Sequence, residues 1–155
     1  AHMNPGEWRD PSRDLPDWLH EGWARVQEMD RFGEARVQCH AEVVNLDFRS
    51  GKRSYYVKEL QRELGKGRLV PFSEISRSHL DQYSALVHMQ IWSVTDYLRR
   101  CDPAAFPRLI ARIKCLSAEL GDDKEGFARA LEEVLNLTPL GLEEAWKADL
   151  AKQRP

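Results

Sequence analysis

The sequence predicts a mainly α-helical protein with a single compact domain of about six helices and at most one short strand or hairpin. Apolar residues recur at helical spacing along most of the chain, as in Leu80, Tyr83, Val87 and Ile91. Glycines and capping residues separate these stretches. With 155 residues, of which 42% are hydrophobic and 31% charged, the chain is long enough to bury a core and has an ordinary globular composition.

The first predicted helix covers residues 15–29. Pro16 suits the first helical position, where its missing N–H has no helical partner to lose. Asp17 then places a negative charge at the positive end of the helix dipole. Gly22 allows another backbone to come close, and Gly33 follows the end of the helix. The apolar face consists of Leu15, Leu19, Trp23 and Val26.

Residues 35–48 are compatible with two conformations. Apolar and polar residues alternate from Ala35 to Val43, and the alternation slips by one place before it resumes at Val44. Strict alternation is typical of a strand, and the slip of a bulge. The same stretch is rich in Ala, Glu, Gln and Arg, which favour helices. The alternation favours an extended or hairpin-like segment, and a helix stays open as the alternative.

The remaining helices follow from apolar periodicity and punctuation. Asp102 and Thr138 each precede a proline, as a capping residue does at a helix start, and Gly65 and Gly121 are stop signals. The predicted helices cover residues 55–64, 79–100, 103–120 and 139–150, and a loop covers residues 65–72. A shorter helix is predicted between the last two, with an apolar face of Phe127, Leu131, Val134 and Leu135. The helical domain thus spans residues 15–151, after a cloning remnant (residues 1–3) and an N-terminal arm that ends at residue 14, and before a frayed tail (residues 152–155).

Composition excludes several classes of function. A net charge of −2 argues against nucleic-acid binding. No apolar run approaches the roughly 18 residues that a membrane-spanning helix needs, and the polar start does not resemble a signal peptide. Cys39, Cys101 and Cys115 lack metal-site spacing and predict buried or partly buried free thiols, which favours the reducing cytoplasm. A Cys101–Cys115 disulfide is the alternative for an exported protein.

Residues 18–24 read Trp-Leu-His-Glu-Gly-Trp-Ala. They resemble the W-L-x-E-G-x-A helix of gluzincin-type zinc metallopeptidases, and most closely the peptidase-MA-like proteins of that clan. The resemblance implies that Glu21 is the third zinc ligand. In that family an upstream H-E-x-x-H helix supplies the other two ligands and the catalytic base. His20 and Glu21 match the first two residues of that motif, but Ala24 stands where its second histidine would be, so the H-E-x-x-H helix is absent from this sequence. The likeness therefore points to the downstream half of a peptidase domain.

Two later segments extend the likeness to about residue 150. Residues 88–98 resemble the family's Y-A-x-A-W-A-L-x-x-F-L helix, and residues 131–136 with 142–150 resemble its closing F-G-x-x-x-x-L-E-x-x-W-x-x-Y-L pattern. The family usually has a tyrosine where this chain has His88. The resemblance therefore implies His88 as a candidate catalytic residue, which would donate a hydrogen bond to a developing oxyanion. The alternative is that His88 has no catalytic role and is a hydrogen-bonded, partly buried histidine.

The sequence thus predicts a partial or degenerate zinc-metallopeptidase-like domain that is catalytically silent by itself. Zinc would be bound by Glu21 in a complete domain, and this chain alone is expected to carry none. The expected partners are an upstream H-E-x-x-H segment or a peptide substrate. The alternative function is a metal-free helical scaffold or protein-interaction module. A zinc site assembled from Glu21, His20 and His88 is a further alternative.

Overall fold

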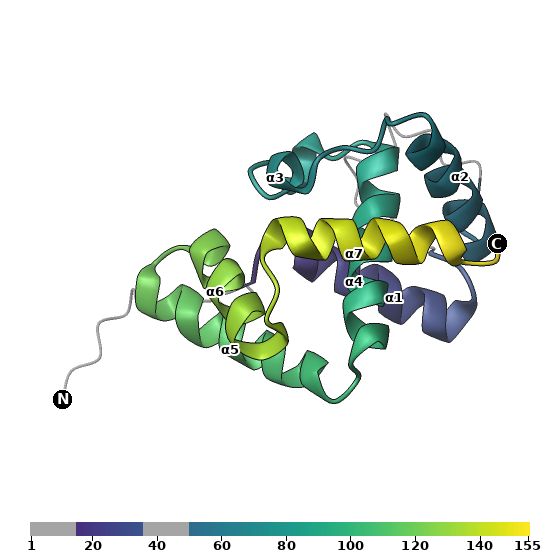
Figure 1. Cartoon of the computed structure of the whole chain (residues 1–155). Helices are drawn as coiled ribbons and strands as arrows, with labels where there is room; N and C mark the ends of the chain where they lie inside the picture. Colours follow the sequence, from purple (N-terminus) through teal and green to yellow (C-terminus); the bar gives the residue numbers. More distant parts are fainter. Residues whose placement is uncertain (1–14, 36–49) are drawn as a thin grey trace.

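Helices make up nearly all of the regular structure in the computed structural model, which describes residues 15–35 and 50–155 (Figure 1). The elements are α1 (Asp17–Phe32), α2 (Arg53–Gly65), α3 (Phe72–Ile75), the 3-10 helix η2 (Leu80–Gln82), α4 (Ala85–Cys101), α5 (Ala105–Leu120), α6 (Asp123–Leu135) and α7 (Pro139–Lys152). Within those two ranges the only β pairing is an isolated bridge between Glu34 and Lys52. The predicted mainly α-helical single domain is confirmed. The strand-or-helix question at residues 35–48 falls almost entirely outside the described residues.

Helix α4 is the centre of the domain. Figure 1 shows α1 and α7 crossing it, with α2 and α3 near one end and the paired helices α5 and α6 near the other. Ten consecutive residues of α4, from Val87 to Asp96, are buried. A helix that is buried all round needs partners on every side, and α1, α2 and α7 supply them.

The predicted start of the long helix at residue 79 was wrong. Helix α4 begins at Ala85, because the Ser84 hydroxyl accepts a hydrogen bond from the Val87 amide at 3.2 Å and so caps the helix. The preceding residues form the separate turn η2, in which the backbone N–H of His79 donates to the Gln82 side chain at 2.9 Å. The apolar stripe ran across this break because both elements pack on the same core.

Several other boundaries differ from the prediction by two or three residues: α1 ends at Phe32 instead of residue 29, and α2 begins at Arg53 instead of residue 55. Pro16 is the N-cap of α1 and does not occupy its first turn. Helix α5 begins at Ala105, two residues late, although the Asp102 carboxylate does accept a hydrogen bond from the Ala105 amide at 2.9 Å. Helix α3 begins at Phe72, where only a loop was expected. The predicted stop signals at Gly33 and Gly121 are confirmed, and both glycines have left-handed backbones.

The predicted close approach at Gly22 is confirmed. A Cβ atom on this residue would lie 2.6 Å from the Ile91 carbonyl oxygen and still closer to the Thr95 hydroxyl. Helices α5 and α6 meet in the same way, because a Cβ on Gly126 would lie 2.7 Å from the Ser117 backbone nitrogen. Glycine therefore sets the spacing of α1 against α4 and of α6 against α5.

Tryptophan side chains form a large part of the core. Trp18, Trp92 and Trp146 are buried, and Trp23 is half-buried against the same core. The cysteine prediction was wrong in one respect: Cys101 and Cys115 are free, as expected, but both are exposed. Cys39 lies outside the described residues. None of the described helices has the length and apolar character that crossing a membrane requires.

Candidate functional site

Helices α1 and α4 bring together three polar side chains from residues far apart in the sequence. Glu21 and Arg25 lie one turn apart on α1, and His88 lies in the first turn of α4. The Arg25 Nη2 atom is 3.0 Å from His88 Nδ1 and 3.2 Å from Glu21 Oε1. The two acceptor atoms are 4.0 Å apart. One guanidinium nitrogen therefore contacts both the predicted metal ligand and the predicted catalytic residue.

This cluster is largely removed from water. Arg25 is 2% exposed and His88 is 0% exposed, whereas the Glu21 side chain keeps 15% of its accessible surface. Arginine is almost never buried without a partner. The carboxylate and the imidazole supply that partnership here.

Burial and charge together hold His88 neutral. Burial, reinforced by the Arg25 guanidinium, lowers its pKa to about 3. A guanidinium only donates hydrogen bonds, so Nδ1 of the ring must accept, and the ring proton is therefore on Nε2. His88 is thus a buried, neutral hydrogen-bond acceptor toward Arg25. The hydrogen bond expected of His88 is observed, but its burial is complete and not partial as predicted.

Tyr83 forms one wall of the cluster. Its ring packs edge-to-face on the His88 ring with centroids 5.7 Å apart, and its hydroxyl donates to the Ser78 carbonyl at 3.3 Å. The pKa of Tyr83 is raised well above its ordinary value, first by burial and then by Asp17, Glu21 and Asp123. The phenol therefore stays protonated at neutral pH.

The sequence pointed to Glu21 and His88 as site residues and missed Arg25 and Tyr83. The signal for Arg25 was its spacing, since a glutamate four residues before an arginine forms an ion pair on one helix face. Nothing in that spacing indicates burial, which depends on α4. Tyr83 was recognised only as part of an apolar stripe.

The present arrangement of Glu21 and His88 does not fit a zinc ion. A zinc ligand must point a lone pair at the metal, and here the facing atoms of both side chains point at a cation. His20 is exposed and does not complete a set. Across residues 15–35 and 50–155, no three His, Cys, Asp or Glu side chains are grouped as metal ligands. His88 also has no exposed surface through which to reach a substrate.

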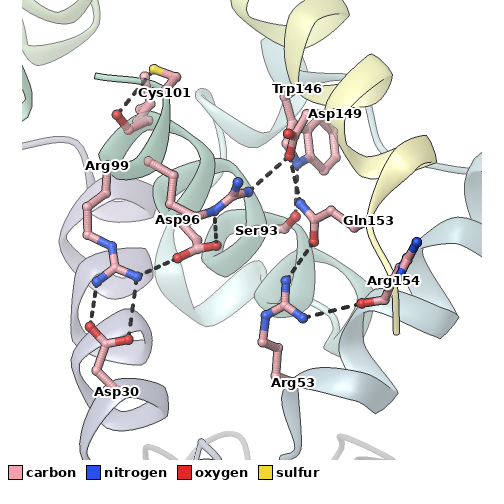
Figure 2. Close-up of polar contacts among 12 residues, drawn as sticks. Asp30, Arg53, Ser93, Asp96, Arg99, Cys101, Trp146, Asp149, Gln153 and Arg154 are labelled. Carbon is pink, nitrogen blue, oxygen red and sulfur yellow. Dashed lines mark hydrogen bonds and ion pairs between the residues drawn. The ribbon is translucent and has the colours of Figure 1, made fainter. Parts of the chain in front are cut away.

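A second polar cluster ties α1, α4 and α7 together (Figure 2). Asp96, which is buried, accepts hydrogen bonds from Arg99 and Arg100, each at 2.7 Å. Arg99 also contacts Asp30 on α1, and Arg100 contacts Asp149 on α7 at 3.0 Å. The charges along this chain of contacts are mutually paired. The cluster therefore explains how three helices are held in register, without the need for a ligand.

An apolar groove of about 270 Å³ lies where α1, α3, α6 and α7 begin. Trp18 lines it together with Phe72 and Phe127, whose rings meet the Trp18 ring edge-to-face. Leu140, at the start of α7, lines the groove and is 65% exposed. The groove lies beside the start of the helix that carries Glu21.

A scan against models of protein families found no match, and searches of curated proteins and of solved structures found none either. The function is therefore argued from the geometry of the residues themselves.

Proposed function

We propose that this chain is a degenerate metallopeptidase-like helical domain that is catalytically silent by itself and serves as a metal-free scaffold. One observation carries the proposal: the Arg25 guanidinium contacts both Glu21 and His88, the two residues that the family resemblance assigns to chemistry. A positive side chain at this position opposes a second cation there. It also uses the hydrogen-bonding atoms that catalysis would need.

The chemistry of a zinc peptidase supports the same proposal. Such a site needs three protein ligands, an open position for water, and a base that takes the proton of that water. Glu21 and His88 offer at most two ligands, and both face Arg25. His88 is neutral, but its full burial keeps it from an oxyanion. The helical framework itself is therefore the part of this chain that would serve a function.

A complete site with an H-E-x-x-H segment from elsewhere is the second candidate. The observation in its favour is the partial exposure of Glu21, which is 15% accessible while Arg25 and His88 are buried. The carboxylate is thus the member of the cluster that an added segment would reach first. It would have to release Arg25 before it could bind metal, which makes the metal-free scaffold the better-supported function.

Zinc binding by the purified chain tests the proposal. Elemental analysis and calorimetric titration would be applied to the wild type, to Glu21→Ala, and to Glu144→Ala, which removes an exposed carboxylate from α7 as a matched control. We expect no stoichiometric zinc in any of the three proteins and no cleavage of a peptide library. Tight one-to-one binding that Glu21→Ala abolishes and Glu144→Ala preserves would refute the proposal.

A further inference from the structure

We infer that the apolar groove at the start of α1, α3, α6 and α7 is the docking site for the chain's own N-terminal residues, with Trp8 as the side chain that enters it. Residues 1–14 lie outside the part of the chain that the structure describes, so the groove and the sequence of the segment carry the inference. None of Glu21, Arg25 and His88 takes part. Docking and the proposed function can therefore be tested separately.

The groove offers a surface that suits an aromatic side chain. Three aromatic rings line it, and the Trp18 ring meets those of Phe72 and Phe127 edge-to-face. Leu140 lines it as well and, at 65% exposure, is the most exposed of the described large hydrophobic side chains. A further aromatic ring would pack against these rings and cover Leu140.

The volume of the groove suits one large side chain. It measures about 270 Å³, which is just below the range of about 300–1,000 Å³ that small-molecule sites occupy. Tryptophan is the largest side chain and buries up to about 250 Å² of surface when it packs. Trp8 is the only Phe, Tyr or Trp among residues 1–14. It is therefore the one side chain of this segment that matches the groove in both size and chemistry.

The chain enters the described structure at the groove itself. Pro16, the N-cap of α1, is one of the residues that line it. Trp8 precedes Pro16 by eight residues, and an extended chain of that length spans about 26 Å. The segment is thus long enough to fold back over the groove without moving any helix.

Charge at the groove favours the same segment. Lys124, in the first turn of α6, lines the groove, is exposed, and makes no ion pair in the described part of the chain. Glu143, the other charged residue of the groove, is already paired with Lys147. Asp10 follows Trp8 by two residues, so in an extended segment the two side chains share a face. Asp10 would therefore meet Lys124 while Trp8 occupies the groove.

The test observes Trp8 in the full chain by fluorine NMR after incorporation of 5-fluorotryptophan. Trp8→Phe identifies the Trp8 signal, and a soluble gadolinium chelate measures the exposure of the ring through the relaxation that it causes. We expect the chelate to relax the Trp8 signal about threefold less in the native chain than in urea, because a ring that is docked most of the time is shielded.

Variants of the groove then locate the ring. Leu140→Arg should remove the shielding of Trp8, and because Leu140 is exposed the fold should be retained, which circular dichroism checks. Leu120→Arg is the matched control, since Leu120 is also exposed but does not line the groove, and it should leave Trp8 shielded. Lys124→Glu should weaken the shielding without altering the apolar lining, and Asp10→Lys should restore it in the double variant.

Three results would overturn the inference. The first is a Trp8 ring that is as exposed in the native chain as in urea. The second is shielding that survives both Leu140→Arg and Lys124→Glu, since the ring would then lie elsewhere, for example in the hollow that Trp23 and Ile110 line. The third is shielding that grows with protein concentration, because the occupant would then be a second copy of the chain. None of these results bears on zinc binding, which tests the proposed function.

Discussion

Replacing Gly22 with alanine tests the contact on which the arrangement of α1 and α4 depends. The added Cβ would lie 2.6 Å from the Ile91 carbonyl oxygen, 3.1 Å from the carbonyl carbon, and still closer to the Thr95 hydroxyl. A rotation of the Thr95 side chain relieves only the last of these contacts. The carbonyl belongs to the α4 backbone, so the helices themselves must separate.

The cost follows from that separation. An ordinary carbon–oxygen contact is about 3.3 Å or longer, so α1 must move about 0.7 Å away from α4 at this point. Overpacking of this kind costs about 1–3 kcal/mol. Because the clash is with a backbone carbonyl, which no side-chain rotation relieves, it belongs to the upper part of that range, about 2–3 kcal/mol. Alanine returns up to about 1 kcal/mol through its better helix propensity. We therefore expect Gly22→Ala to lower the free energy of unfolding by about 1–2 kcal/mol.

Denaturant unfolding followed by circular dichroism measures this loss, with Gly65→Ala as the control. Gly65 ends α2, and a Cβ there meets no atom within 4 Å, so that variant should be neutral or more stable by up to about 1 kcal/mol. Thr95→Ala should rescue Gly22→Ala only in part, because Ile91 is unchanged. Equal stability of Gly22→Ala and the wild type would refute the reasoning, as would complete rescue by Thr95→Ala.

Two further predictions concern buried polar groups. The pKa of His88 is lowered to about 3, so between its unfolded value near 6.5 and about 3 the unfolded chain binds a proton that the folded chain does not. The free energy of unfolding should accordingly fall by up to about 1.4 kcal/mol per pH unit below pH 6.5. Denaturant unfolding from pH 7 to pH 5 measures this slope, which should disappear in His88→Gln. Ser93→Ala removes the acceptor of a buried hydrogen bond of 2.9 Å that the Trp146 indole N–H donates. The free energy of unfolding should fall by about 1–3 kcal/mol in the same assay. An unchanged midpoint would show that the indole finds another partner.

Helix identity and most helix ends could be predicted because they depend on local chemistry. Gly33 and Gly121 adopt the left-handed conformation that a helix end requires, and the Thr138 hydroxyl caps α7 by accepting from the Gly141 amide at 3.0 Å. The start of α4 was predicted wrongly for a related reason. Ser84 caps α4 but lies within a run of regularly spaced apolar residues. The spacing of apolar residues alone does not reveal that a hydroxyl between them begins a helix.

The candidate site was less predictable because it depends on tertiary contacts. Glu21 and Arg25 have the spacing of an ordinary surface ion pair, and the similar pair of Glu125 and Arg129 on α6 is indeed exposed. The difference arises from α4, which covers Arg25 and brings His88 from 63 residues away in the sequence. No pattern within α1 contains that information.

Packing alone explains the aromatic residues in the stretch that resembles a peptidase helix. The Trp18 ring meets Phe72 and Phe127 edge-to-face, with centroids 4.9 and 5.1 Å apart. The Trp23 ring packs against Phe106 at 5.1 Å. Aromatic pairs of this kind stabilise a core whatever the ancestry of the helix. These residues therefore argue for the fold and carry no independent weight for zinc chemistry.

Leu19 and Gly22 are explained in the same way, one by complete burial and the other by the backbone of α4. Glu21 is the exception, because it lies off the apolar stripe and packing does not require a carboxylate there. Its partner supplies the reason: Arg25 is 2% exposed, and a buried guanidinium needs a counter-charge and an acceptor. Glu21 supplies a counter-charge and His88 an acceptor. The buried Arg25 thus explains why a glutamate stands at position 21. To bind a zinc ion, Glu21 would have to release Arg25.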